Sequence, residues 1–271
     1  MAPKVPKKPS VEKKEEKTKD KKDKKDVSKI KISEPDPCKL RILCLHGFRT
    51  SGKIMAEQVT LANWSPLIDD IADLVFMDAP WPASGKSDVE KRFAGPYYEW
   101  YQANEDYTEI YGLKEATSLI SSFISKHGPF DGIIGFSQGG ILSAALMGLN
   151  EKGMGPQIPN INFLILVGGG RSKAKILRPA YFDTIMCSSL HMIGDKDYMR
   201  ESGESLLKAF HDPTVIRHPS GHVVPKLDTN DGAIFRDFLV KQLEFKLSPC
   251  EDENKNQEHN ASYFEDHIAL A

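Results

Sequence analysis

DGIIGFSQGG, residues 131–140, joins an apolar strand-like run to a cluster of glycines around Ser137. Its centre, GFSQG at residues 135–139, is a G-x-S-x-G motif with a predicted strand before it and a predicted helix after it. The flanking glycines allow a sharp turn that lifts the serine oxygen above the sheet. The backbone N–H of Gln138 then points toward the same space, where it can stabilise developing negative charge. The alternative is an incidental serine in a tight turn, and the strand–turn–helix context favours the reactive one.

A serine nucleophile needs a base, and the base needs a carboxylate to orient it. In α/β hydrolases the chain order is serine, acid, histidine. After Ser137 the sequence offers HMIGDKDYM, which contains Asp197, and HPSGHVVP, which contains His222. Each follows a predicted strand, so both are expected at the same sheet edge as the serine.

Other residues compete for these roles. Asp195 is two residues from Asp197 and could serve as the acid, although we expect it to form the turn or cap the next helix. His218 ends a predicted strand and is interpreted as a hydrogen-bonded structural histidine. His46 is given an architectural role in the first glycine turn, and His127 is explained by its favourable place at a helix C-terminus.

An oxyanion site needs a second donor beside Gln138. The loop after the first predicted strand, His46-Gly47-Phe48, supplies one in the backbone N–H of Phe48. This loop lacks the HGGG form found in many lipases and esterases.

Apolar strand-like runs alternate with helical patterns along the chain, which predicts a mostly parallel sheet of about six strands covered on both faces. Right-handed crossovers make this a doubly wound α/β structure. The strands are expected at 40–48, 73–80, 130–137, 161–169, 189–194 and 214–219. The helices are expected at 54–64, 108–127, 139–149, around 204–210 and at about 230–245.

Five blocks in order carry a resemblance to a known family: LRILCLHGFRTSG, GPYYEWY, IIGFSQGGILSA, LHMIGDKDYM and PSGHVVP. Together they resemble the FSH-type serine hydrolases over roughly residues 38–246. The resemblance implies a reduced α/β-hydrolase fold with Ser137 as nucleophile, Asp197 as acid and His222 as general base. It also implies ester hydrolysis without a cofactor or metal, in the cytoplasm and also the nucleus. GFSQGG alone is shared with acyl-protein thioesterases, whereas HGFRTSG and GPYYEWY favour the FSH group.

Aromatic residues are concentrated between the second predicted strand and the long helix. Residues 81–111 hold eight of the 24 aromatics, so this excursion could cover an active site. One interpretation is an apolar, partly mobile wall for an acyl chain, with Tyr97, Tyr98 and Trp100 as substrate-binding residues. The other is that the rings only pack the excursion onto the core.

The charge is unevenly distributed. Residues 1–30 hold twelve lysines and six acidic residues, a local charge of +6, so the remainder of the chain carries −8. Such a head could contact nucleic acid, an anionic membrane or an import receptor, but interspersed acids and few apolar residues favour a solvated tail. We therefore predict a disordered head at 1–37, a hydrolase domain at 38–247 and an acidic, disordered tail at 248–271.

Composition narrows the class of protein to which this chain could belong. No apolar run approaches the ~20 residues that span a bilayer, and none follows the charged start as a secretory signal would. The four cysteines are widely spaced and are interpreted as reduced thiols. No metal, nucleic acid or dinucleotide cofactor is expected, and the partner is a small acyl ester.

The leading functional hypothesis is a serine esterase that acts through an acyl-enzyme. The alternatives are a thioesterase acting on acyl-proteins or acyl-CoA, a non-catalytic receptor that keeps a hydrolase pocket, and an interaction protein that works through its charged tails. The oligomeric state and the physiological substrate do not follow from the sequence.

Overall fold

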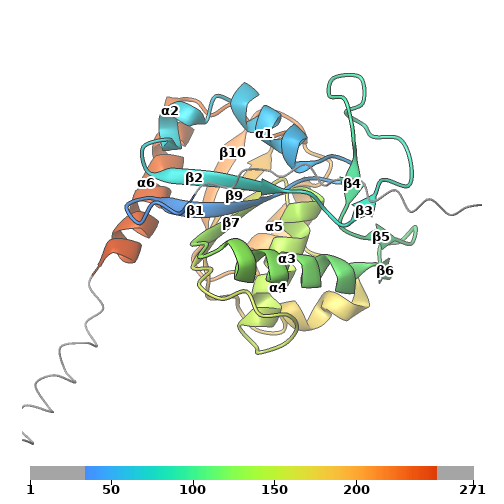
Figure 1. The fold of residues 1–271 in the computed structure, drawn as a ribbon. Coiled ribbons are helices and arrows are strands. Elements are labelled where there is room, and N and C mark those ends of the chain that lie inside the picture. The colour runs from blue at the N-terminus through green and yellow to red at the C-terminus, as the bar shows by residue number, and fades with distance from the viewer. Residues whose placement is uncertain (1–33, 249–271) are drawn as a thin grey trace, which may run out of the picture. The chain divides into compact units, whose positions relative to one another are not determined.

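The computed structural model describes residues 34–248. The predicted head and tail therefore lie outside the described residues, apart from residues 34–37 and 248. Figure 1 shows a central sheet with helices on both faces.

The central sheet has six strands in the order β10-β9-β8-β7-β1-β2, and every neighbouring pair is parallel. This confirms the predicted fold class and strand number. The strands are β1 (Leu40–Leu45), β2 (Ala72–Met77), β7 (Gly132–Phe136), β8 (Phe163–Val167), β9 (Ser188–Gly194) and β10 (Thr214–His218).

The two faces of the sheet are covered by different helices (Figure 1). One face packs on α1, α2 and α6, where Trp64, Phe235 and Phe238 belong to the same buried cluster as the strand residues Ile42 and Phe163. The other face carries α3, α4 and α5. The helices are α1 (Gly52–Leu61), α2 (Ser65–Ile68), α3 (Leu113–His127), α4 (Gln138–Asn150), the 3₁₀ helix η1 (Lys175–Tyr181), α5 (Arg200–Leu207) and α6 (Thr229–Leu247).

The helix expected at 108–127 begins only at Leu113. Gly112 has φ 79°, a left-handed conformation that interrupts the helical path just before it. The residues before Gly112 instead form β6 (Ile110–Tyr111), which pairs with β5 (Gln102–Ala103). A second small hairpin, β3 (Trp81–Pro82) with β4 (Tyr98–Glu99), lies at the base of the aromatic excursion, and neither hairpin was predicted.

The strand order indicates where along the sheet a functional site is expected. The chain runs outward from β1 to β2 on one side, and from β7 through β8 and β9 to β10 on the other, so the order reverses between β1 and β7. Sites in open α/β sheets form outside the carboxyl ends of the strands at such a reversal. Phe48 lies in the loop after β1 and Ser137 directly follows β7, so both lie at this point.

Candidate active site

Ser137 occupies a strained turn between β7 and α4. Its φ is 52° and its ψ is −116°, outside the conformations that non-glycine residues favour. Its neighbours must be glycine: a Cβ on Gly139 would lie 2.1 Å from the Leu45 carbonyl oxygen, and one on Gly135 would lie 2.6 Å from the Gly139 oxygen. The G-x-S-x-G pattern thus reflects backbone contacts on both sides of the serine.

His222 reaches Ser137 from the loop after β10. Its Nε2 lies 2.8 Å from Ser137 Oγ, and its Nδ1 lies 2.9 Å from both carboxylate oxygens of Asp197. Asp197 follows β9, is buried, and also accepts a hydrogen bond of 2.7 Å from the Met199 N–H. The three side chains therefore form a continuous line from carboxylate to hydroxyl, the arrangement that lets an imidazole take a proton from serine.

Two aromatic rings flank the imidazole. Phe136 lies 5.2 Å from the His222 ring, measured between centroids, and Tyr198 lies 4.6 Å away. Tyr198 is 77% exposed, so it forms part of the rim of the site. Tyr198 was not among the site residues expected from the sequence, although its position directly after Asp197 is a usable signal.

Asp195, the competing candidate for the acid, pairs with Arg200 and not with His222. Asp195 is half-exposed and faces Arg200, whose guanidinium is 3.8 Å from its carboxylate. It makes no hydrogen bond with His222. The turn after β9 thus directs Asp197, and not Asp195, toward the imidazole.

The competing histidines His46 and His218 take no part in the hydrogen-bonded line from Asp197 to Ser137. His46 is fully buried; its Nε2 accepts a hydrogen bond of 3.0 Å from the Ala79 N–H, and burial lowers its pKa to about 4. Those contacts fit the expected architectural role. His218 differs from expectation: its ring is buried, but its Nδ1 has no hydrogen-bond partner among residues 34–248, and burial lowers its pKa.

The two expected oxyanion donors have free N–H groups. Within the described part of the chain, neither the Phe48 nor the Gln138 amide donates to a protein acceptor. Gln138 is the first residue of α4, a 13-residue helix whose dipole adds positive potential there. Both amides are therefore available to a ligand.

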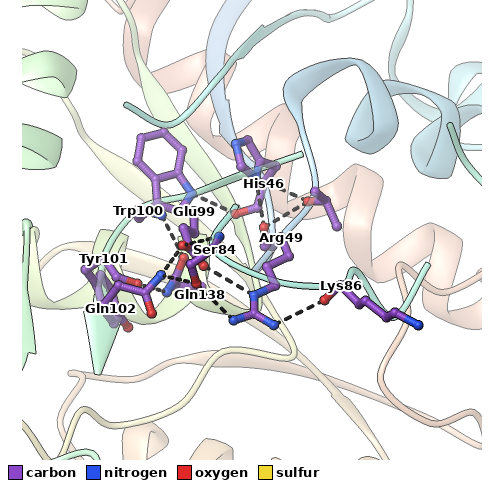
Figure 2. A network of polar contacts seen from close by, with 11 residues as sticks. His46, Arg49, Ser84, Lys86, Glu99, Trp100, Tyr101, Gln102 and Gln138 are labelled. Atoms are coloured by element: carbon purple, nitrogen blue, oxygen red, sulfur yellow. Dashed lines mark hydrogen bonds and ion pairs between the residues drawn. The ribbon is translucent and has the colours of Figure 1, made fainter. Parts of the chain in front are cut away.

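A polar network ties these two donors to one segment of the excursion (Figure 2). The Gln138 side chain accepts a hydrogen bond of 2.8 Å from the Trp100 backbone N–H and donates one of 2.8 Å to the Tyr101 carbonyl. The Trp100 indole N–H donates to the carbonyl of His46, also at 2.8 Å. The loop after β1 and the start of α4 are thus held by the same few residues.

A buried carboxylate anchors that segment. Glu99 is 1% exposed and accepts hydrogen bonds from the Ser84 N–H at 2.9 Å, from Arg49 Nε at 3.4 Å, and from the Gln102 amide. Arg49 also donates to the Lys86 carbonyl at 3.2 Å (Figure 2). No local pattern indicates this pair beyond the presence of an arginine after HGF and a glutamate in GPYYEWY.

The structure corrects one expectation about the aromatic segment. Trp100 is 0% exposed and its indole is committed to His46, so it supports the loop and does not line a surface that a substrate could reach. Tyr97 and Tyr98 are partly buried, and Tyr97 donates to the Phe93 carbonyl at 2.7 Å. Their contact with a substrate stays a prediction.

No group of three metal-ligating side chains occurs in residues 34–248. Over the same range, no helix combines the length and the apolar character needed to cross a membrane. The cysteines that the structure describes, Cys38, Cys44 and Cys187, are free thiols.

Comparison with known proteins identifies a family and a shared fold. Residues 36–234 match the family model described as serine hydrolase (FSH1). Esterase OVCA2 of Danio rerio is 32% identical over 225 residues, covering 74% of this chain and 97% of that protein. Esterase AGAP003155 of Anopheles gambiae is 29% identical over 244 residues, covering 83% and 88%. Acyl-protein thioesterase 2 of Zea mays superposes with a TM-score of 0.55 at 17% identity, covering 78% of this chain and 97% of that one, which shows a shared α/β-hydrolase fold.

Proposed function

The chain belongs to the FSH1 family of serine hydrolases and is an esterase, and from that premise we propose that Ser137, His222 and Asp197 form its catalytic triad. The observation that carries the proposal is the continuous hydrogen-bonded line from Asp197 through His222 to Ser137.

In the proposed first half-reaction, Ser137 Oγ attacks the ester carbonyl carbon while its proton passes to His222 Nε2. The carbonyl oxygen becomes negatively charged and receives hydrogen bonds from the Phe48 and Gln138 N–H groups. When the tetrahedral intermediate collapses, the bond to the alcohol oxygen breaks and the alcohol leaves with the proton from His222. The acyl group stays on Ser137 as an ester.

In the second half-reaction, water repeats the attack on the acyl-enzyme. His222 takes a proton from the water, and the same two N–H groups stabilise the oxyanion. Collapse returns the proton to Ser137 Oγ and releases the carboxylic acid. Asp197 holds the Nδ1–H tautomer of His222 and stabilises the imidazolium in both steps.

For the substrate we propose a small-molecule ester with an acyl chain of moderate length. Tyr97 and Tyr98 of the excursion are proposed contacts for that chain, and the exposed ring of Tyr198 beside His222 is a further one. Phe48, whose backbone N–H is a proposed oxyanion donor, is 41% exposed, and its ring offers a further apolar surface. Such rings bind apolar chains without demanding one particular structure.

A thioesterase is the second candidate, because the fold is shared with an acyl-protein thioesterase and the same triad can expel a thiolate. The deciding experiment compares kcat/KM for butyryl esters and butyryl thioesters with leaving groups of matched acidity. A preference for the oxygen ester above about tenfold supports the esterase, and the opposite preference makes the thioester the substrate. A protein that cleaves neither, but binds an acyl ligand, would be a receptor.

We also propose a location in the cytoplasm and the nucleus. The free thiols of Cys38, Cys44 and Cys187 fit a reducing compartment, where such side chains persist without pairing. Fractionation of cells that express the full chain tests this, and recovery in a secretory compartment would overturn it.

A further inference from the structure

A cavity of about 420 Å³ lies between the excursion and η1, the 3₁₀ helix that follows β8. Three cationic side chains line it, Arg171, Lys173 and Arg178, together with two aromatic ones, Tyr181 and Phe182. No carboxylate is among the lining residues. The cavity thus combines apolar ring surface with several positive charges.

Among residues 34–248, the three cations have no acidic partner. Within residues 34–248, none of them lies within 4.0 Å of a carboxylate oxygen, whereas the nearby acids are engaged elsewhere: Glu109 with Lys175 at 4.0 Å and Asp183 with Lys152 at 3.7 Å. Residues 171–178, RSKAKILR, carry four positive charges and no negative one, although residues 31–271 as a whole carry −8. Clustered like charge of this kind around a hollow attracts the opposite charge.

Arg171 is held in place by the buried tyrosine beneath it. Its guanidinium lies 5.0 Å from the centre of the Tyr181 ring and donates to the Tyr181 carbonyl at 3.5 Å. The Tyr181 hydroxyl in turn accepts a hydrogen bond of 3.4 Å from the Ser172 N–H. A positioned guanidinium is suited to a carboxylate or phosphate, because it offers several donors in a fixed geometry.

The cavity lies close to the proposed active site along the chain. The Ser137 N–H donates to the Val167 carbonyl at 2.9 Å, and Arg171 is four residues beyond Val167, a reach of at most about 14 Å. A Cβ on Gly168, in the same connection, would lie 3.1 Å from the His222 ring. The connection after β8 thus runs directly from the triad to the cationic cavity.

The excursion approaches both sites as well. Thr108 lines the cavity, and its carbonyl accepts a hydrogen bond of 2.9 Å from the Lys175 N–H. The same excursion also contacts the residue after Ser137, since the Trp100 backbone N–H donates a hydrogen bond of 2.8 Å to the Gln138 side chain. The far end of a molecule bound to Ser137 can therefore reach the cavity.

We propose that this cavity binds an anionic group of the substrate, so that the enzyme prefers esters or thioesters with a carboxylate or phosphate remote from the carbonyl. The proposal rests on the proposed function of Ser137. The group that the cavity would bind is an oxyanion that an apolar spacer separates from the reacting carbonyl. It could be a carboxylate at the end of the acyl chain or a phosphate in the leaving group.

Two pairs of substrates separate these sources. The first pair is the mono-p-nitrophenyl ester of octanedioic acid against p-nitrophenyl octanoate, which differ by a terminal carboxylate on the acyl chain. The second is butyryl-4′-phosphopantetheine against butyryl-pantetheine, which differ by a phosphate on the leaving group. Each pair is measured with the wild-type chain, with the triple variant Arg171→Gln, Lys173→Gln, Arg178→Gln, and with Lys175→Gln, which removes a charge from the same segment outside the cavity lining.

In at least one pair, wild type should favour the anionic member by about tenfold or more in kcat/KM, chiefly through KM, which corresponds to about 1.4 kcal/mol. The triple variant should lose that preference and keep its kcat on the neutral member, while Lys175→Gln keeps both. Equal rates within both pairs, or a preference that survives in the triple variant, would overturn the proposal. Failure of the wild type to cleave any of the four substrates would instead count against the proposed function itself.

Discussion

The side chain of Gln138 bridges to Trp100, its Oε1 accepting a hydrogen bond of 2.8 Å from the Trp100 backbone N–H. The Trp100 indole then bonds to the His46 carbonyl, two residues before Phe48. The amides of Gln138 and Phe48 are the two proposed oxyanion donors. Their spacing is thus set by one shared support, and a glutamine that follows the nucleophile has a role for its side chain as well as for its backbone.

Replacing Gln138 with methionine tests this support. Gln138→Met keeps the backbone N–H and the side-chain length but removes the side-chain hydrogen bonds to Trp100 and Tyr101. We expect kcat for a short ester to fall by about 10- to 100-fold, because even a small misplacement of an oxyanion donor weakens transition-state stabilisation. KM should stay within about twofold. Steady-state kinetics on p-nitrophenyl butyrate measures both constants.

Ser143→Ala is the matched control. Ser143 is a buried residue of the same helix, and its hydroxyl donates to the Gly139 carbonyl of that helix at 2.7 Å. Both variants should be destabilised, but only Gln138→Met should lose kcat. Equal kcat in the two variants would show that the bridge does not position the donors.

The choice between the two aspartates after β9 gives a second prediction. Asp197→Asn should lower kcat by about 10⁴-fold, the magnitude seen when the orienting acid of other serine hydrolases is changed to the amide. Asp195→Asn should lose less than about tenfold, because that carboxylate faces Arg200 and not His222. The reverse ranking in kcat would reassign the acid to Asp195.

Much of the fold was predictable because it rests on local patterns. Six apolar runs of strand length, alternating with helical patterns, predicted the sheet, and the structure has all six strands within a few residues of the expected positions. The glycines around Ser137 indicated a backbone constraint, and the structure explains it, since a Cβ at Gly139 or Gly135 would lie only 2.1 or 2.6 Å from a backbone oxygen. Residues that follow the carboxyl ends of parallel strands lie at one edge of the sheet, which is why Ser137, Asp197 and His222 could be grouped.

What the sequence did not reveal depends on how the excursion folds back. The two short hairpins bury few residues and have no clear alternation, so the sequence of residues 81–111 predicts an aromatic-rich excursion but not its strands. The pairing of Arg49 with Glu99 joins positions fifty residues apart and has no local signal. Trp100 was placed in a substrate wall because its type suits one, but burial and its bond to His46 give it a supporting position.

The exposed rim of the site leads to a third prediction. Tyr198→Ala and Tyr98→Ala should each reduce kcat/KM for long esters more than for acetate, because each methylene that a ring covers contributes up to about 0.8 kcal/mol. An acyl-chain series from acetate to decanoate measures the slope. Tyr111→Ala, which removes a 56% exposed ring from β6, serves as the control and should leave the slope unchanged. A loss that is equal at every chain length would make these rings structural.

A buried histidine on β9 gives a prediction for acid stability. His191 is 2% exposed, and burial lowers its pKa to about 3 from an ordinary value near 6.5. Between these pH values the unfolded chain binds the proton and the folded one does not, so stability is full above about pH 6.5 and falls as the pH drops. His191→Leu should therefore reduce the loss of unfolding free energy between pH 7 and pH 5 by about 2 kcal/mol. Urea titrations at the two pH values measure it, and an unchanged difference would show that His191 is protonated in the folded chain.

The most direct test of the central claim is to label the full-length chain with a fluorophosphonate and map the modified residue by mass spectrometry. A serine that has a base at 2.8 Å and two free amides beside it should react, and the adduct should lie on Ser137 alone. Ser137→Ala should abolish both the label and ester hydrolysis while its thermal unfolding stays close to that of the wild type. Labelling of another residue, or a Ser137→Ala chain that still hydrolyses p-nitrophenyl butyrate at the wild-type rate, would contradict the account.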